Sequence, residues 1–397
     1  MIVADRRGAQ RVLPSFLSYG FRPFFLLEGL WFAAALLLWM VIFMLGAILP
    51  SRFDPLSWHI HEMLFGFVMA TIAGFLLTAI ANWTGRSPVS GPPLALLAAL
   101  WLLGRVCCLV SGFLPTWLAA AGDLAFPALL TAVVGQEIIG GRNWRNLPMI
   151  GVLVVLGFAN LLMHLEAAGV NVASGLGWRL GLAAIIVLIS VVGGRITPSF
   201  TRNWLAKRQV QDLPPPPGII DRAALSTLHA GLFAWVFMPE FSPIGWLLLV
   251  GAGLNLRRLL QWRGPATVPE PLLFVLHIGY AWMVFGVALL GLSMLDVDMP
   301  LSAAVHALTA GAIGTMTLAV MTRATRGHTG RELSADIVTS TIYVLISVAA
   351  IMRVAAAFAS SWSMLLLVGS ACLWVAAFTG FVLCYSPMLL RPAADHQ

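Results

Sequence analysis

The feature that most constrains this chain is a series of apolar runs, each long enough to cross a membrane and separated only by short polar turns. Twelve runs are predicted, near residues 24–49, 58–81, 92–113, 115–139, 146–169, 178–195, 222–239, 243–262, 271–293, 300–322, 334–359 and 361–386. About 20 apolar residues match the hydrocarbon thickness of a bilayer, and 60% of the residues are hydrophobic while 10% are charged. The chain is therefore expected to be an all-α polytopic membrane protein, a single domain over residues 1–397 with the lipid bilayer as its partner.

The placement of the 23 Lys and Arg residues predicts the orientation of the spans. Basic residues concentrate in alternate loops, and such loops remain in the cytoplasm. Both the N-terminus and the C-terminus are then cytoplasmic, as is the Pro-rich loop 196–221, which is expected to form an extended strut. The net charge of +7 thus reflects membrane orientation, and no basic stripe with interleaved aromatic residues indicates a nucleic acid partner.

Two of the predicted spans repeat one another at an offset of 245 residues. One begins at His61 and ends at Arg86, and the other begins at His306 and ends at Arg331. Without a gap they share His61/His306, Gly66/Gly311, Ala79/Ala324, Thr84/Thr329, Gly85/Gly330 and Arg86/Arg331. Each copy carries an ionisable imidazole into the membrane, where such groups are costly and by default mark a functional site.

A third echo extends the repeat to the whole chain. Asn82-Trp83 recurs as Asn203-Trp204, again just beyond a span. Three four-helix units are therefore expected, over about 24–139, 146–262 and 271–386, related by a pseudo-threefold arrangement. This architecture resembles the catalytic subunit of haem-copper oxidases, although a shared fold does not by itself confer a function.

The matched histidines are the strongest candidates for a cofactor site. His61 and His306 are expected to hold one haem b between them, because haem iron is commonly ligated by histidine. Gly66 and Gly311, in the same helices, would let a flat ring approach the backbone. The alternative is that each histidine makes an interhelical hydrogen bond.

The other histidines are expected to serve different partners. His59 points about 200° away from His61 on a helix, so it is either a lip residue or a ligand to a second centre. His164 is expected to bind metal or relay protons near the outer surface, or to cap its helix. His229 and His277, with His164 as a further candidate ligand, would form a copper site, since imidazole suits copper, or remain packing residues.

Charged residues and cysteines inside the spans are expected to find partners there. Arg105 is predicted to pair with Asp123, while haem propionates are an alternative partner for both Arg105 and Arg353. The four cysteines, Cys107, Cys108, Cys372 and Cys384, lie within spans and are expected to be small apolar filling, with copper ligation as the lesser alternative. No Cys-x-x-Cys-His motif occurs, which excludes covalent c-type haem.

Four segments together resemble the NnrS family of bacterial inner-membrane proteins. They are GFRPFFLLEGLWFA, WHIHEMLFGFVMATIAGFLLTAIANWTGR, GRITPSFTRNWL and HALTAGAIGTMTLAVMTRATRGHTGR. The resemblance covers nearly the whole chain, and it implies a protein with haem and copper that is associated with denitrification and with defence against nitric oxide. The family's histidine positions fall here on His59, His61, His306 and His328, with His229 and His277 as further matches.

The resemblance implies a physiological role more firmly than a reaction. The leading hypothesis is an inner-membrane haem protein that protects against nitrosative stress by binding or converting nitric oxide at a haem and copper centre. Whether it is an enzyme stays open at this point. A secondary transporter that exports a nitrosylated metal or thiol species is one alternative, because internal repeats and midplane polar residues also mark transporters. A non-catalytic haem-binding sensor or assembly factor is the other. The sequence does not indicate an oligomeric state.

Overall fold

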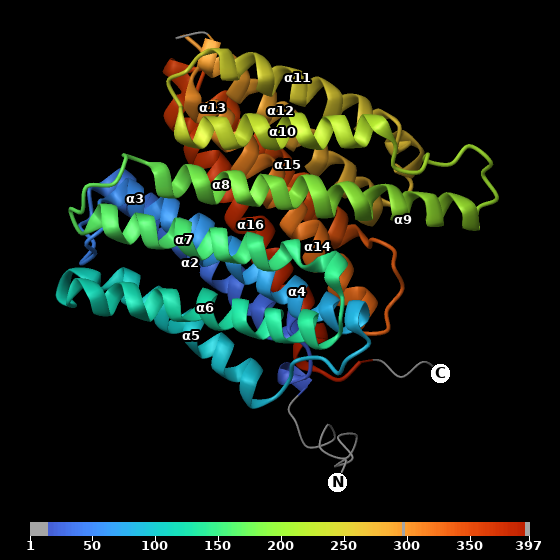
Figure 1. Cartoon of the computed structure of the whole chain (residues 1–397), viewed down its shortest axis with the longest axis horizontal. Coiled ribbons are helices and arrows are strands. Elements are labelled where there is room, and N and C mark those ends of the chain that lie inside the picture. Colours follow the sequence, from blue (N-terminus) through green and yellow to red (C-terminus); the bar gives the residue numbers. More distant parts are fainter. Residues whose placement is uncertain (1–14, 296–297, 394–397) are drawn as a thin grey trace. The chain divides into compact units, whose positions relative to one another are not determined.

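The computed structural model describes residues 15–295 and 298–393, and this part of the chain is helical, with no strand (Figure 1). Ten helices in it are long and apolar enough to cross a membrane: Phe21–Leu45, Pro55–Thr84, Pro92–Leu109, Thr116–Gly140, Trp144–Ala167, Leu176–Lys207, Pro271–Leu295, Leu301–His328, Ile337–Ala355 and Ser360–Leu390. The prediction of an all-α fold is therefore confirmed for the described residues, and these ten helices are consistent with the predicted multi-pass membrane protein. The two chain ends, predicted to be cytoplasmic, lie outside the described residues.

The remaining two predicted spans are helices, but they do not belong to these ten. They are α10 (Ile219–Phe237) and α11 (Pro243–Leu260). Charged residues lower their apolar character, since α10 begins with Asp221 and Arg222 and α11 ends with Arg257 and Arg258. The count of twelve spans therefore stays a prediction, as does the oxidase-like arrangement.

The chain divides into two compact units. Unit 1 comprises Met1–Trp178, Arg323–Glu332 and Val382–Gln397, and unit 2 comprises Arg179–Thr322 and Leu333–Phe381. The main helices of unit 1 are α2 (Phe21–Leu45), α3 (Pro55–His61), α4 (Met69–Thr84), α5 (Pro92–Leu109), α6 (Thr116–Gly140) and α7 (Pro148–Ala167). Those lying wholly or mainly in unit 2 are α8 (Leu176–Leu188), α9 (Gly194–Lys207), α10, α11, α12 (Pro271–Leu295), α13 (Leu301–His306), α14 (Gly314–His328), α15 (Ile337–Ala355) and α16 (Ser363–Leu390).

Within unit 1, α5 packs along α6, α6 packs along α7, and α2 packs along α4. Proline begins α3, α5 and α7, where its missing N–H costs no helical hydrogen bond. The Asp54 side chain caps α3 by accepting hydrogen bonds from the N–H groups of Leu56 and Ser57. These fixed starts set the register of the helices that carry the polar residues described below.

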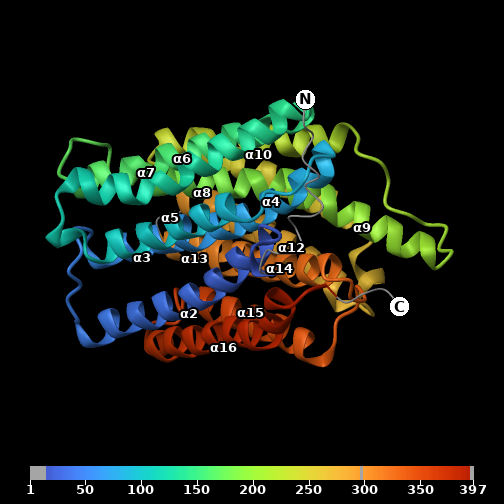
Figure 2. The same ribbon diagram turned by 90° about the horizontal axis from the view of Figure 1, so that it is seen from below.

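Within unit 2, α11 packs between α10 and α12. The backbones of α11 and α12 approach closely because Gly245 faces Gly291, and a Cβ atom at Gly245 would lie 2.5 Å from the Gly291 carbonyl oxygen. Helices α15 and α16 lie side by side (Figure 2), where the Ser370 hydroxyl donates to the Ala349 carbonyl at 2.8 Å.

The two repeated helices share an interruption of their helical geometry. A π-helical segment, η2 (Glu62–Val68), follows His61, and another, η7 (Ala307–Ile313), follows His306. The bounds of η7 are those of η2 displaced by 245 residues, which is the offset of the sequence repeat. A third π segment, η5 (Ile189–Gly193), lies in the helix that carries the third echo. Short π segments are rare in proteins, and those that occur often lie at functional sites.

The shared Thr-Gly-Arg tripeptide ends both repeated helices in the same way. Thr84 and Thr329 each bond back to the carbonyl four residues earlier, at 2.8 and 2.7 Å. Gly85 and Gly330 then adopt left-handed backbone angles, with φ of 68° and 72°, which glycine takes without a steric penalty. The identities at this end of the repeat therefore encode a helix stop.

The predicted strut over residues 196–221 is partly wrong, because α9 continues as a helix to Lys207 despite Pro198. Proline removes the N–H that would bond the carbonyl four residues earlier, that of Gly194. Arg258 of α11 replaces this donor: its Nη2 lies 3.1 Å from the Gly194 oxygen, and its Nη1 lies 3.0 Å from the Ser190 oxygen in η5. The four prolines at 214–217 are non-helical, as expected.

Candidate metal centre

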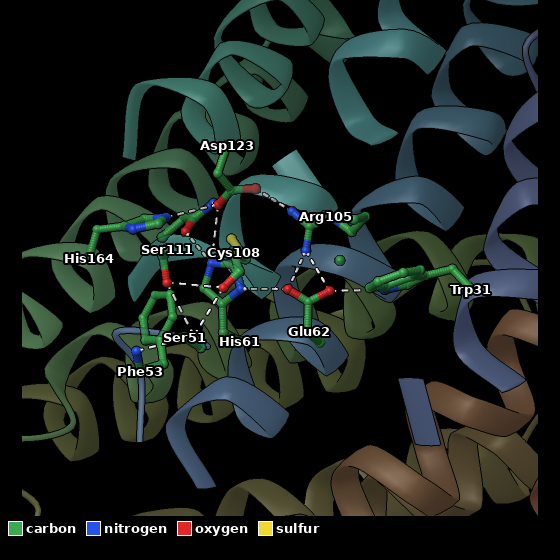
Figure 3. A network of polar contacts seen from close by, with 12 residues as sticks. Trp31, Ser51, Phe53, His61, Glu62, Arg105, Cys108, Ser111, Asp123 and His164 are labelled. Carbon is green, nitrogen blue, oxygen red and sulfur yellow. Dashed lines mark hydrogen bonds and ion pairs between the residues drawn. The ribbon is translucent and has the colours of Figure 1, made fainter. Parts of the chain in front are cut away.

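Five helical segments of unit 1 bring polar side chains to one buried point (Figure 3). His61 ends α3 and Glu62 begins η2, while α5 contributes Arg105 and Cys108. Asp123 comes from α6, and Asn160 and His164 come from α7. On α5 and α7 the paired residues are three and four positions apart, so each pair lies on one helix face. All seven side chains are buried.

Four of these residues form a cluster with the donor atoms of a metal site. One ligand atom from each of His61, Cys108, Asp123 and His164 lies within 4.8 Å of all the others. Asp123 Oδ2 is 3.1 Å from Nε2 of both histidines, and the two imidazole centroids are 5.3 Å apart. Two imidazoles, a thiolate and a carboxylate are ligands that zinc and copper accept. Among the described residues this is the one group of three or more such side chains.

An ion network adjoins the cluster and holds one of its members, Asp123, in place. The Arg105 Nη1 atom lies 2.8 and 2.9 Å from the two carboxylate oxygens of Glu62, and Nη2 donates to Asp123. Trp31 donates its indole N–H to Glu62 at 2.9 Å. The predicted pairing of Arg105 with Asp123 is thus confirmed. The haem propionate considered for Arg105 would have to compete with these two carboxylates.

Asn160 and Glu62 hold the His61 ring from both sides. The Asn160 amide donates to Asp123 Oδ2 at 2.7 Å, and its oxygen lies 2.8 Å from His61 Nε2. His61 Nδ1 lies 3.2 Å from Glu62 Oε1. Both ring nitrogens therefore have polar partners inside unit 1, and the side chain has no exposed surface.

The charges of the network balance only if one of the histidines is protonated or a cation is bound beside them. One guanidinium, Arg105, faces two carboxylates, Glu62 and Asp123, so the fixed charges sum to −1 when both histidines are neutral and the thiol is protonated. An uncompensated charge in a membrane interior is expensive. A metal cation among the four ligands would offset it, and a thiolate at Cys108 would increase that attraction.

The equivalent glycines of the repeat each face a side chain of their own unit. A Cβ atom at Gly66 would lie 2.6 Å from Arg105 Nη1, so this glycine makes room for the guanidinium. A Cβ atom at Gly311 would lie 2.5 Å from the ring of Trp282. The flat group that approaches Gly311 is therefore an indole, and the approach predicted for a haem at these two positions stays untested.

The histidines outside the cluster lie in different surroundings. His59 stacks on Trp39, with centroids 4.5 Å apart, so it faces a different partner from His61, as predicted. His306 belongs to unit 2, where Nδ1 lies 2.7 Å from the Ser302 carbonyl oxygen. A haem shared by His61 and His306 therefore stays a prediction.

The predicted copper ligands of unit 2 each contact a hydroxyl group. His229 Nε2 lies 2.9 Å from the Ser190 hydroxyl, and His277 Nε2 lies 2.9 Å from the Thr201 hydroxyl. A copper site at these two residues stays a prediction. Arg353, a predicted cofactor contact, lies in the last turn of α15, where a cation is favoured by the helix dipole.

Sequence reasoning missed three members of the site: Cys108, Glu62 and Asn160. Cys108 follows Arg105 by three residues and Asn160 precedes His164 by four, so both share a helix face with a residue that had been singled out. An intramembrane Glu62 beside His61 was a further signal. The sequence pairs Asp123 with Arg105, and Cys108 lies on the same helix face as Arg105. Together these two relations place Cys108 near the Asp123 carboxylate.

Comparison with known proteins gives one family. Residues 15–393 match the family model described as NnrS protein. No curated protein matches the chain.

Proposed function

Because this chain belongs to the NnrS family, we propose that it is an inner-membrane protein of the nitric oxide response that acts at a metal ion held by unit 1. The observation that carries the proposal is the cluster of His61, Cys108, Asp123 and His164, whose ligand atoms lie within 4.8 Å of one another in a fully buried place. The family's association with nitric oxide suggests nitric oxide as the molecule that meets this metal ion. Ten helices of spanning length supply the membrane setting.

Copper is the metal that this donor set and this role favour. A thiolate with two imidazoles suits copper as well as zinc, but zinc has no redox chemistry. A copper ion in the cluster would supply a redox-active centre toward nitric oxide. The protein's own residues do the rest: Asp123 and His61 are held in place by Arg105, Asn160 and Glu62, and such supporting contacts orient metal ligands.

Haem b is the other candidate cofactor for His61. Haem ligation through His61 would have to break its contacts with Asn160 and Glu62 and open a fully buried ring. A metal ion needs no such opening, since the ligand atoms already converge. The geometry of unit 1 therefore supports a metal ion at His61 better than a porphyrin.

Metal analysis and absorption spectra of the purified protein test the proposal. We expect about one copper ion per chain, lost in Cys108→Ser and in Asp123→Asn. Cys107→Ser is the matched control, because Cys107 neighbours Cys108 but does not belong to the cluster; it should keep its copper. The copper-loaded protein should also react with nitric oxide, seen as a change in its spectrum.

Two outcomes contradict the proposal. Copper that survives both cluster variants binds elsewhere, and a protein that takes up no copper under any loading condition has no such site. Consumption of nitric oxide by membrane vesicles separates a catalyst from a sensor. Accumulation of a nitrosylated species across the vesicle membrane without consumption identifies a transporter.

A further inference from the structure

A hollow of about 490 Å³ lies in unit 1 between the end of α2 and the segment that leads into α3. The side chains that line it are mostly apolar and include those of Trp39, Ile42, Phe43, Leu49, Phe53 and Pro55. Ser51 also lines it. At the rim, Phe43 and Ile48 are exposed, Ile48 almost completely, at 95%. The mouth of the hollow is therefore apolar as well as its walls.

Phe53 is the wall that the hollow shares with the metal cluster. Its ring centroid lies 4.9 Å from that of His61 and 5.1 Å from that of His164. The same residue lines the hollow, and only 5% of it is exposed. Figure 3 shows Phe53 beside the imidazoles of His61 and His164. Phe53 thus borders both the hollow and the two imidazoles of the cluster.

From this arrangement we propose that the hollow admits a small uncharged molecule from apolar surroundings and that rotation of the Phe53 side chain gates its passage to the cluster. The inference rests on the proposed function for the identity of that molecule as nitric oxide. No charged side chain lines the hollow, so an ion would find no charged partner there to offset the hydration that it loses. A neutral diatomic molecule meets no such cost.

The backbone around the gate is fixed, which assigns the movement to the side chain. The N–H of Arg52 donates to the Ser111 hydroxyl at 2.8 Å, and the Gly112 N–H donates to the Pro50 carbonyl at 2.9 Å. The Ser51 hydroxyl donates to the Cys108 carbonyl at 3.0 Å. The segment is thereby tied to the end of α5, the helix that carries Cys108.

Chemical modification of the Cys108 thiol measures how readily a small molecule reaches the cluster, and it needs no bound metal. In metal-free protein whose other three cysteines are replaced by alanine, the rate of modification is measured with methyl methanethiosulfonate, which is small and neutral. The anionic sulfonatoethyl methanethiosulfonate is the comparison reagent. The ratio of the two rates cancels any change in the acidity of the thiol. We expect the neutral reagent to react preferentially, and Phe53→Ala to raise its rate about tenfold, which corresponds to a barrier lower by about 1.4 kcal/mol.

Closing the hollow should have the opposite effect. Ile42→Trp fills it, and we expect the neutral reagent to slow about tenfold. Because Ile42 is only 4% exposed and its replacement risks misfolding, Ile48→Trp at the exposed rim is the second variant. The matched controls are Phe113→Ala and Ile139→Trp, whose side chains are 80% and 54% exposed and lie outside the lining. Both should leave the rates unchanged.

The proposal is overturned if the Phe53, Ile42 and Ile48 variants all leave the modification rates unchanged. It is also overturned if the neutral and anionic reagents react with Cys108 in the ratio seen with a free thiol. A rate that rises only after phospholipid is removed overturns it too, because the hollow then seats an acyl chain. The gate and the proposed function can fail separately. If Phe53 controls the modification of Cys108 but the protein never binds copper, the gate stands and the proposed metal site fails. If copper binds but Phe53 does not affect the modification, the metal site stands and the gate fails.

Discussion

At the scale of single residues, Arg105 decides whether the candidate metal centre can exist. It is 2% exposed and bonds carboxylates from two other helical segments, η2 and α6. Removing one partner of a buried ion pair leaves the other charge uncompensated, at a cost of about 3–5 kcal/mol. Here one change leaves two carboxylates without their cation.

We therefore expect Arg105→Gln to lower the thermal stability of the detergent-solubilised protein strongly and to abolish copper binding. Arg86→Gln is the matched control. It removes an exposed arginine, whose pKa is raised by the hydrogen bond and charge of Glu137 at 2.5 Å, and exposed pairs contribute little. Thermal unfolding monitored by circular dichroism compares the two. Equal losses of thermal stability in the two variants would mean that the Arg105 ion pairs contribute no more than an exposed pair.

At the scale of helical elements, the π segments are the main departure from regular structure. In η2 the widened turns follow His61 and carry Glu62, so both residues depend on the local register. Deleting one residue of such a segment restores a regular helix, and one residue corresponds to a rotation of about 100°. The histidine would then leave the cluster while the span persists.

Deletion of Met63 is accordingly expected to abolish copper binding with little change in helix content, measured by metal analysis and circular dichroism. Deletion of Ser90, in the irregular segment between α4 and α5, is the control and should keep the metal. A Met63 deletion that retains full copper would show that the π segment has no part in placing His61.

The partnership between Pro198 and Arg258 makes a second element-scale prediction. Arg258 donates to the Gly194 oxygen that Pro198 leaves without a helical donor. Pro198→Ala restores an N–H for that oxygen, so Arg258→Met should cost less in the Pro198→Ala background. A double-mutant cycle of unfolding free energies should give a coupling of about 0.5–1.5 kcal/mol. Additive effects would mean that the two residues act independently.

The elements also mark where sequence reasoning succeeded and where it stopped. Helices occupy all twelve predicted ranges, because an apolar run of spanning length leaves few alternatives. The Arg105–Asp123 pair followed from the cost of an isolated buried charge. Cys108 did not follow, since a cysteine in a span usually packs as a small apolar group. The helical course of residues 197–207 depended on a distant donor, Arg258, that no local pattern announces.

At the scale of the whole molecule, the path of α10 and α11 determines the number of membrane crossings. Their lengths, 19 and 18 residues, are close to what a bilayer requires, so we expect both to cross. The turn between them would then face outward. Glu240→Cys in that turn should react with an impermeant thiol reagent added outside intact cells.

Asp212→Cys, in the Pro-rich segment, is the matched control and should react only after the cells are opened. Both positions are exposed, so accessibility to solvent is not limiting. Protection of Glu240→Cys from outside, with reaction after opening, would mean that the pair forms a hairpin on the cytoplasmic side and that ten crossings suffice.

The matching widened turns after His61 and His306 carry a consequence for the history of this gene. An extra residue in a helix is an insertion, and two independent insertions at one register are improbable. The simplest descent places the insertion in a single ancestral segment before it was copied. The widened turn that follows His61 is then older than the cluster beside it, and the copy after His306 inherited the same turn with a different set of neighbours.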